Sequence, residues 1–177
     1  METLRGKKAS LRPMKPKEVE LIHKWANNPD VIPHWYGKKM SLKEIKDDWK
    51  PHYFNDNDPY SGRCFAIEVD DKPIGMVNYN EIDKDNQKVE IDIIIGERNN
   101  WNKGYGTDAL KTLISYLFKK FKINRIWLAP YLSNPRAIRA YEKVGFRREG
   151  ILRENSFING KFVDDVMLSV IRREFKA

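Results

Sequence analysis

The segment that most constrains the fold is residues 89–121, where an apolar strand, a glycine loop and an amphipathic helix follow one another. Residues 89–93 alternate apolar and acidic side chains, which predicts a half-buried strand. Ile94 and Ile95 break the alternation, which indicates either a β-bulge or a strand that becomes buried on both faces. Residues 107–121 place apolar side chains at helical spacing and predict a helix with one buried face.

The loop before that helix carries Gly104 and Gly106 next to Lys103. A glycine turn that leads from a strand into a helix presents free backbone N–H groups and the positive end of the helix dipole to a phosphate. The sequence lacks both the Walker pattern and the dinucleotide fingerprint. It therefore predicts a phosphate-binding loop that belongs to neither an NTPase nor a dinucleotide enzyme.

Charge is distributed unevenly along a chain whose formal net charge is +8. Residues 101–150 carry 11 basic and 3 acidic side chains, whereas residues 51–100 carry 5 basic and 11 acidic ones. The basic block predicts an anionic partner, and the acidic block predicts a neutral or cationic one. Two solvated faces would also explain the pattern, and a nucleic acid would also explain the basic block.

The order of the remaining elements predicts the fold class. Strands are expected at residues 10–14, 63–69, 74–79, 125–129 and 166–171, helices at 17–27, 41–49 and 135–143, and hairpin turns at 70–73 and 159–160. Hairpins come first, a strand–helix–strand–helix stretch follows, and another hairpin closes the chain. This order predicts an α+β fold with a mixed sheet, and 177 residues predict a single domain over 1–177.

Several classes of protein are excluded by composition. The single cysteine, Cys64, rules out an internal disulfide framework and a cysteine-based zinc site, and the spacing of the three histidines predicts no metal site. No apolar run approaches the ~20 residues of a membrane span. The polar, basic N-terminus shows no signal peptide. We therefore expect a cytoplasmic protein that needs neither metal nor membrane.

Three segments, VEIDIIIG, NNWNKGYGTDAL and SNPRAIRAYEKVGF, resemble the GNAT superfamily of acetyl-CoA-dependent N-acetyltransferases. Gly104 and Gly106 match the glycines of the family motif R/Q-x-x-G-x-G/A, and Trp101 departs from it at the Arg or Gln position. Both ends of the chain are similar to the RimJ/RimL branch, which includes ribosomal-protein, spermidine and aminoglycoside 6′-N-acetyltransferases. The resemblance implies one GNAT-type domain with a mixed, mostly antiparallel sheet whose central strands splay apart between flanking helices.

The resemblance also implies acetyl-CoA as cosubstrate and no metal. It places the pantetheine arm on the strand and the pyrophosphate on the glycine loop, with further contacts from the helix that follows Asn134. The cofactor-binding residues it implies are Ile93, Ile94, Ile95, Trp101, Asn102, Lys103, Gly104, Tyr105, Gly106, Thr107, Asn134, Ala137, Tyr141 and Lys143.

The catalytic residues that the resemblance implies are a tyrosine acid and a carboxylate base. Tyr141 would protonate the leaving thiolate, and its alternative role is that of a core aromatic. Asp92 is expected to take the proton of the amine, and Glu90 is the second candidate for this base. The alternative role of both carboxylates is to attract a cationic substrate. Trp35 and Tyr36, together with Asp92, are expected to contact the acceptor, although the two aromatic residues also fit plain packing.

The sequence leaves the acceptor open among several cationic amines. The aromatic segment PHWYG favours an aminoglycoside 6′-amine, whereas Lys38 and Lys39 argue against a polyamine, and a ribosomal-protein N-terminus stays open. A non-catalytic nucleic-acid-binding domain is the alternative of another class. The preserved Gly104, Gly106 and Tyr141 argue against it. A homodimer is compatible with the resemblance.

Overall fold

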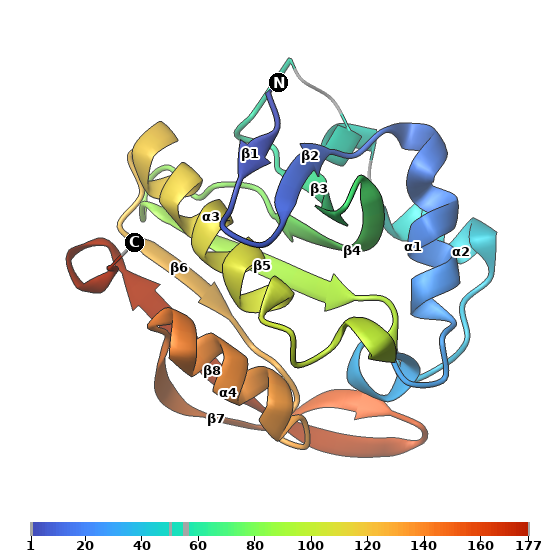
Figure 1. Cartoon of the computed structure of the whole chain (residues 1–177). Coiled ribbons are helices and arrows are strands. Elements are labelled where there is room, and N and C mark those ends of the chain that lie inside the picture. The colour runs from blue at the N-terminus through green and yellow to red at the C-terminus, as the bar shows by residue number, and fades with distance from the viewer. Residues whose placement is uncertain (1, 50, 55–56, 177) are drawn as a thin grey trace.

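The structure is a computed structural model that describes residues 2–49, 51–54 and 57–176. Its described strands form one eight-stranded sheet in the order β1-β2-β3-β4-β5-β6-β8-β7 (Figure 1). The strands are β1 (Leu4–Arg5), β2 (Ser10–Pro13), β3 (Arg63–Val69), β4 (Lys72–Tyr79), β5 (Lys88–Ile95), β6 (Arg125–Leu128), β7 (Arg147–Ile158) and β8 (Lys161–Ile171). Neighbouring strands run antiparallel except β5 and β6, which run parallel.

The two parallel strands part halfway along their length. Residues Lys88 to Glu90 of β5 pair with Arg125 to Trp127 of β6, and the pairing ends there. The rest of β5 stays paired with β4 up to Ile95. The sheet therefore opens at its centre, as the expected splay of the central strands requires, and this prediction is confirmed.

Helices cover both faces of the sheet. They are α1 (Val19–Ala26), α2 (Leu42–Asp48), α3 (Tyr105–Lys120) and α4 (Pro135–Val144), with short 3-10 turns at Pro16–Glu18, Ile32–His34, Pro51–Phe54, Arg98–Asn100 and Arg172–Glu174. In β4, Met76 packs in the cluster that contains the buried side of α1, whereas Val77 packs in the cluster of α3 and α4. Successive strand residues point to opposite faces, so the two helix pairs lie on opposite sides of the sheet (Figure 1).

Local sequence explains where the helices begin and end. Ser41 and Glu44 form the expected capping box at the start of α2, with the Ser41 hydroxyl accepting from the Glu44 amide. Asn134 caps α4, Pro135 fills the first helical position, and Gly145 ends the helix at a positive φ of 112°. These caps confirm the expected helices at residues 41–49 and 135–143 to within two residues.

The pairing of β5 with β4 decides between the two explanations of the broken alternation at Ile94. The register with β4 runs without a shift from Ile91 opposite Tyr79 to Ile95 opposite Gly75. Ile94 instead belongs to the α1–α2 cluster, whereas Ile93 and Ile95 pack against the α3–α4 cluster. Of the two explanations of the broken alternation, the second therefore holds: apolar layers on both sides of the sheet bury this part of the strand on both faces.

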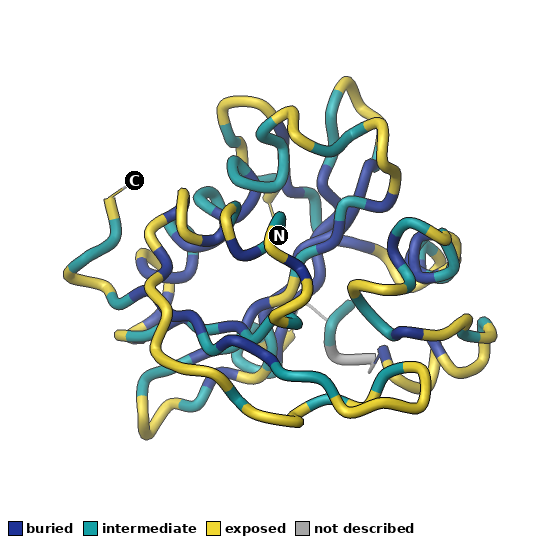
Figure 2. Tube along the Cα trace, turned by 90° about the horizontal axis from the view of Figure 1, so that it is seen from below, coloured by how far each residue is buried: buried dark blue, intermediate teal, exposed yellow. Residues whose placement is uncertain are grey.

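Two strands fall outside the sequence-based expectation. β1 has only two residues, and β7 begins at Arg147, twelve residues before the expected hairpin turn at 159–160. The first part of β7 is charged and mostly exposed because it forms the outer edge of the sheet. Figure 2 shows this contrast, with buried segments through the middle of the molecule and exposed ones at its outer turns and strands. Within the described residues, no helix is long and apolar enough to cross a membrane.

Candidate active site

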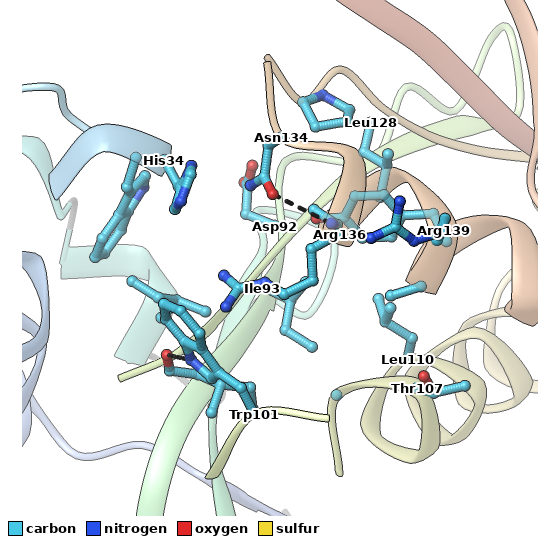
Figure 3. Close-up of a pocket in the computed structure, with 18 of the residues that line it drawn as sticks. His34, Asp92, Ile93, Trp101, Thr107, Leu110, Leu128, Asn134, Arg136 and Arg139 are labelled. Carbon is cyan, nitrogen blue, oxygen red and sulfur yellow. Dashed lines mark hydrogen bonds between the residues drawn. The ribbon is translucent and has the colours of Figure 1, made fainter. Parts of the chain in front are cut away.

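A cavity of about 520 Å³ lies where β5 and β6 separate. Its walls come from the second half of β5, the loop and first turn of α3, the inner face of α4 and the segment before α2. Figure 3 shows Asp92 and Ile93 in the middle of this space, with His34 on one side and Thr107 and Arg139 on the other. The splayed sheet therefore gives the cavity two ends with different chemistry.

The first end is the N-terminus of α3. Gly104 is the N-cap residue with a φ of 83°, and the first backbone hydrogen bond of the helix runs from Asp108 N to Gly104 O at 3.0 Å. The amides of the preceding turn, from Tyr105 to Thr107, therefore have no carbonyl partner within the helix. Because Gly104, Tyr105, Gly106 and Thr107 line the cavity, this turn offers donors to an anion.

Basic side chains of α4 extend this end of the cavity. Arg136, Arg139 and Lys143 all line it, at helical spacing on one face. The guanidinium carbon of Arg136 lies 3.2 Å from the centre of a Trp101 ring, and burial lowers the pKa of Arg136. Trp101 itself donates from Nε1 to Ile95 O at 2.9 Å. Sequence reasoning missed Arg136 and Arg139, although their spacing from Lys143 was a readable signal.

Most residues implied by the resemblance for the cofactor line this cavity. They are Ile93, Ile94, Ile95, Trp101, Asn102, Gly104, Tyr105, Gly106, Thr107, Asn134, Ala137, Tyr141 and Lys143. Lys103 is not among the lining residues, and its carbonyl faces the ammonium of Lys8 at 2.9 Å. Asn134 is buried and uses Oδ1 to accept from Ala137 N at 3.2 Å, so the side chain already has a structural role as a helix cap (Figure 3).

The cavity suits the chemistry of acetyl-CoA. Unpaired helix amides and three basic side chains match the phosphates of that molecule, and the apolar side chains of Ile93, Ile95 and Leu110 match a pantetheine arm. Within the described residues, no group of three or more His, Cys, Asp or Glu side chains could hold a metal ion.

The other end of the cavity carries two carboxylates on one face of β5. Asn78 donates from Nδ2 to Asp92 Oδ2 at 3.2 Å, and Asn80 donates from Nδ2 to Glu90 Oε2 at 3.1 Å. Asp92 is open to the cavity, yet the protein walls around it desolvate the carboxylate and raise its pKa. Burial also raises the pKa of Glu90, and the negative charge of Asp92 adds to that shift.

Tyr141 is buried on α4 and lines the same cavity. Burial raises the pKa of its hydroxyl, the negative charge of Asp92 raises it further, and Arg136 acts in the opposite direction. The hydroxyl has no hydrogen-bond partner in the described part of the chain. A tyrosine that holds its proton firmly and faces an open space can donate that proton to a bound substrate.

The two aromatic residues expected at the acceptor site have different surroundings. Trp35 lines the cavity, and so does His34 of the same aromatic segment. Tyr36 is not a lining residue. Its hydroxyl donates to Asp48 and accepts from Trp49 Nε1 at 3.3 Å, so it packs between α2 and the cavity wall. Tyr131, also in the wall, donates from its hydroxyl to the carbonyl of Trp35.

The cavity combines free amides at the N-terminus of α3 with two carboxylates on β5. This combination suits an enzyme that passes a group from a phosphate-bearing donor to a cationic acceptor. The domain described as Acetyltransferase (GNAT) matches residues 9–147. The chain belongs to the GNAT acetyltransferase family, and it is an acetyl-CoA-dependent N-acetyltransferase. The non-catalytic alternative is therefore not retained.

Individual relatives agree with this assignment along nearly the whole chain. Spermidine N(1)-acetyltransferase of Escherichia coli K12 is 27% identical over 168 residues, which cover 94% of this chain and 88% of the relative. The structure of spermidine N-acetyltransferase from Vibrio cholerae with CoA and spermine gives a TM-score of 0.81 at 27% identity and covers 94% and 97% of the two chains.

A third similarity concerns the fold alone. The aminoglycoside acetyltransferase AAC(6′)-Ib in complex with ribostamycin and coenzyme A gives a TM-score of 0.78 at 23% identity and covers 95% of this chain and 96% of that one. Together these structures confirm the expected α+β GNAT-type fold. They also show that this one fold serves acetyltransferases whose acceptors differ.

Proposed function

We propose that this enzyme transfers the acetyl group of acetyl-CoA to a primary amine of a small polycation. The observation that carries the proposal is the pair Asp92 and Glu90 on β5, both of which line the cavity, with Asp92 near the middle of the space and apart from Thr107 on the first turn of α3 (Figure 3). Carboxylates attract an ammonium group and hold it near the centre of the cavity. A polycation has further charged amines that such a pair can bind while one amine reacts.

The chain supplies a proton acceptor for the attacking amine and a proton donor for the leaving sulfur. Acetyl-CoA contributes the acetyl group as a thioester. Asp92 takes one proton from the acceptor ammonium, which frees the nitrogen lone pair to form the new bond to the acetyl carbon. Tyr141 then gives its proton to the departing sulfur as the carbon–sulfur bond breaks, and the second proton of the attacking nitrogen leaves through solvent and restores the Tyr141 hydroxyl, so that the products are a neutral amide and a free thiol. The raised pKa of Asp92 suits a base, because a more basic carboxylate takes a proton more readily.

Two acceptor classes are supported by different observations. Trp35 and His34 in the cavity wall favour a ring-bearing acceptor such as an aminoglycoside, with its 6′-amine at Asp92. The spermidine acetyltransferase relatives favour a linear polyamine. Lys38 and Lys39 argued against a polyamine in the sequence, but neither is a cavity-lining residue, and Lys38 pairs with Glu44 at 3.2 Å. That objection to a polyamine therefore loses its force.

A panel of acceptors tests the proposal directly. Purified enzyme with acetyl-CoA is offered spermidine, spermine, kanamycin, ribostamycin and a ribosomal-protein N-terminal peptide, and thiol release is followed over time. Turnover should be confined to the polycationic small molecules, and the Asp92→Asn variant should lose it. Turnover of the peptide alone would overturn the small-polycation proposal in favour of a protein acceptor. The expected cytoplasmic location and homodimer stay predictions.

A further inference from the structure

The N-terminal turn between β1 and β2 is fixed against the first turn of α3. The carboxylate of Asp108 accepts from the backbone amides of Lys7, Lys8 and Ala9 at 3.1, 2.8 and 3.0 Å. Gly6 allows this approach, because a Cβ there would lie 2.3 Å from Asp108 Oδ2. These hydrogen bonds therefore hold the turn next to the anion-binding loop, although the two segments lie about 100 residues apart in sequence.

The fixed turn directs one side chain at the glycine loop. The ammonium of Lys8 donates to the carbonyl of Lys103 at 2.9 Å. An ideal Cβ on Gly104 would lie 3.2 Å from the same ammonium, so Lys8 covers the outer side of this residue. Lys8 itself is exposed and is not a residue of the cavity wall.

This hydrogen bond sets the direction of the next amide. In a trans peptide, the carbonyl of one residue and the N–H of the following residue point to opposite sides. With the Lys103 carbonyl turned towards Lys8, the Gly104 N–H points away from Lys8, and Gly104 borders the cavity on its inner side. Since glycine adopts both signs of φ at little cost, the loop alone would leave this peptide free to rotate.

We infer that Lys8 is a positioning residue for acetyl-CoA, because it holds the Lys103–Gly104 peptide with its carbonyl outward and its N–H towards the phosphate site. A rotated peptide would present a carbonyl oxygen, which repels a diphosphate, in place of a donor. The inference rests on acetyl-CoA binding at the α3 N-terminus and does not depend on the identity of the acceptor.

Calorimetric titration with CoA and with 3′-dephospho-CoA tests this role. Lys8→Met keeps the length of the side chain and removes its donor, so it should weaken the binding of both ligands by about tenfold. Lys8→Arg should restore most of the affinity, because a guanidinium can still donate to the Lys103 carbonyl. Lys7→Met is the matched control: it removes an equal charge one residue away and should change affinity by less than about twofold.

Each other outcome overturns the inference. Wild-type affinity in Lys8→Met, or an equal loss in Lys7→Met, would show that the Lys8 hydrogen bond does not position the loop. A loss seen with CoA and absent with 3′-dephospho-CoA would make Lys8 a direct ligand of the 3′-phosphate instead. If the wild-type enzyme bound neither ligand, that result would contradict both the cofactor site at α3 and the positioning role of Lys8. Thermal melts of the free variants exclude a general loss of folding.

Discussion

At the scale of single residues, the proposed reaction centre combines two groups whose proton affinities are raised by the same cause. Tyr141 and Asp92 both border the cavity, and burial is the largest contribution to the raised pKa of each. The effect serves the two roles differently. The raised pKa keeps the Tyr141 hydroxyl protonated at neutral pH but makes it a weaker acid, so its help to the leaving thiolate is modest, whereas the carboxylate becomes a better acceptor for the proton of an ammonium group.

Replacing Tyr141 with phenylalanine removes the proposed acid and keeps the ring. The ring packs against Phe146 with a centroid distance of 5.9 Å, so the variant should fold normally. A thiol of ordinary pKa, ~8.5, leaves without extreme difficulty, so kcat should fall by about 10²-fold. Steady-state kinetics should place the loss in kcat, with the KM for acetyl-CoA unchanged. An unaltered kcat would reduce Tyr141 to a packing residue.

Asp92→Asn removes the proposed base at nearly constant size. An acceptor amine with a pKa of ~10.4 is almost wholly protonated at neutral pH, so the rate should fall most there and recover towards the wild-type value near pH 10. In the wild type, activity should decline as the pH falls through the raised pKa of Asp92, above the ~3.9 of an ordinary aspartate. A pH series of kcat and KM separates this role from simple attraction of a cation, which would raise KM alone.

The same substitution has an opposite effect on stability. Because the folded state raises the pKa of Asp92, it favours the neutral carboxyl, and ionisation at neutral pH destabilises the fold. Asp92→Asn should therefore melt at a slightly higher temperature than the wild type at pH 7. The difference should fade below about pH 3.9, where Asp92 is protonated in both folded and unfolded chains. A lower melting temperature at pH 7 would contradict this account.

At the scale of elements, the N-terminus of α3 depends on a left-handed residue. Gly104 precedes the helix at a φ of 83°, and Gly160, in the distant β7–β8 turn, has a φ of 76° with no atom within 4 Å of the place that a Cβ would take. An alanine at either position has to adopt the same unfavourable backbone region. The pair therefore allows the strain of a substitution to be separated from its effect on the anion site.

Gly104→Ala and Gly160→Ala should each lose about 1–2 kcal/mol of folding free energy, a fall in melting temperature of ~2–8 °C for a chain of this size. Only Gly104→Ala should also weaken CoA binding, because relief of the strain moves the amides that meet the phosphates. Melting curves and calorimetric titrations on both variants measure the two effects. Equal CoA affinity in the two variants would contradict the role of the loop.

The sequence predicted elements well where local signals suffice. The Ser41–Glu44 capping box, the Asn134 cap and the apolar face of α3 all lie where they were expected. Prediction from the sequence failed where contacts with neighbouring elements decide how a strand is buried or where it begins. The break at Ile94 could not separate a bulge from a strand buried on both faces, because no local pattern reveals a second apolar layer. The start of β7 was missed because an exposed edge strand needs no apolar alternation.

At the scale of the whole molecule, the cavity exists because distant segments converge on the split in the sheet. Its walls come from β5, from α3 and α4, and from the loop that carries His34 and Trp35. The motif residues could be read from the sequence because each sits in a local pattern. Lys8 could not be placed in this way, because its role depends on a contact with Lys103 that only the folded chain creates. The helical spacing of Arg136 from Lys143 was readable, but its stacking on Trp101 was not.

Because the cavity lies between the two halves of the sheet, a ligand that fills it should stabilise the whole domain. At 100 times its Kd, acetyl-CoA should add ~2.7 kcal/mol to the free energy of unfolding, which for a chain of this size is a rise of ~5–10 °C in melting temperature. ATP at the same concentration is the control, because it offers phosphates to the α3 N-terminus but has no arm to lie along Ile93 and Ile95 between the parted strands. A smaller rise with ATP than with acetyl-CoA is therefore expected in thermal melts. Equal shifts would mean that the phosphate site alone binds the ligand and that the space between β5 and β6 does not hold the pantetheine arm.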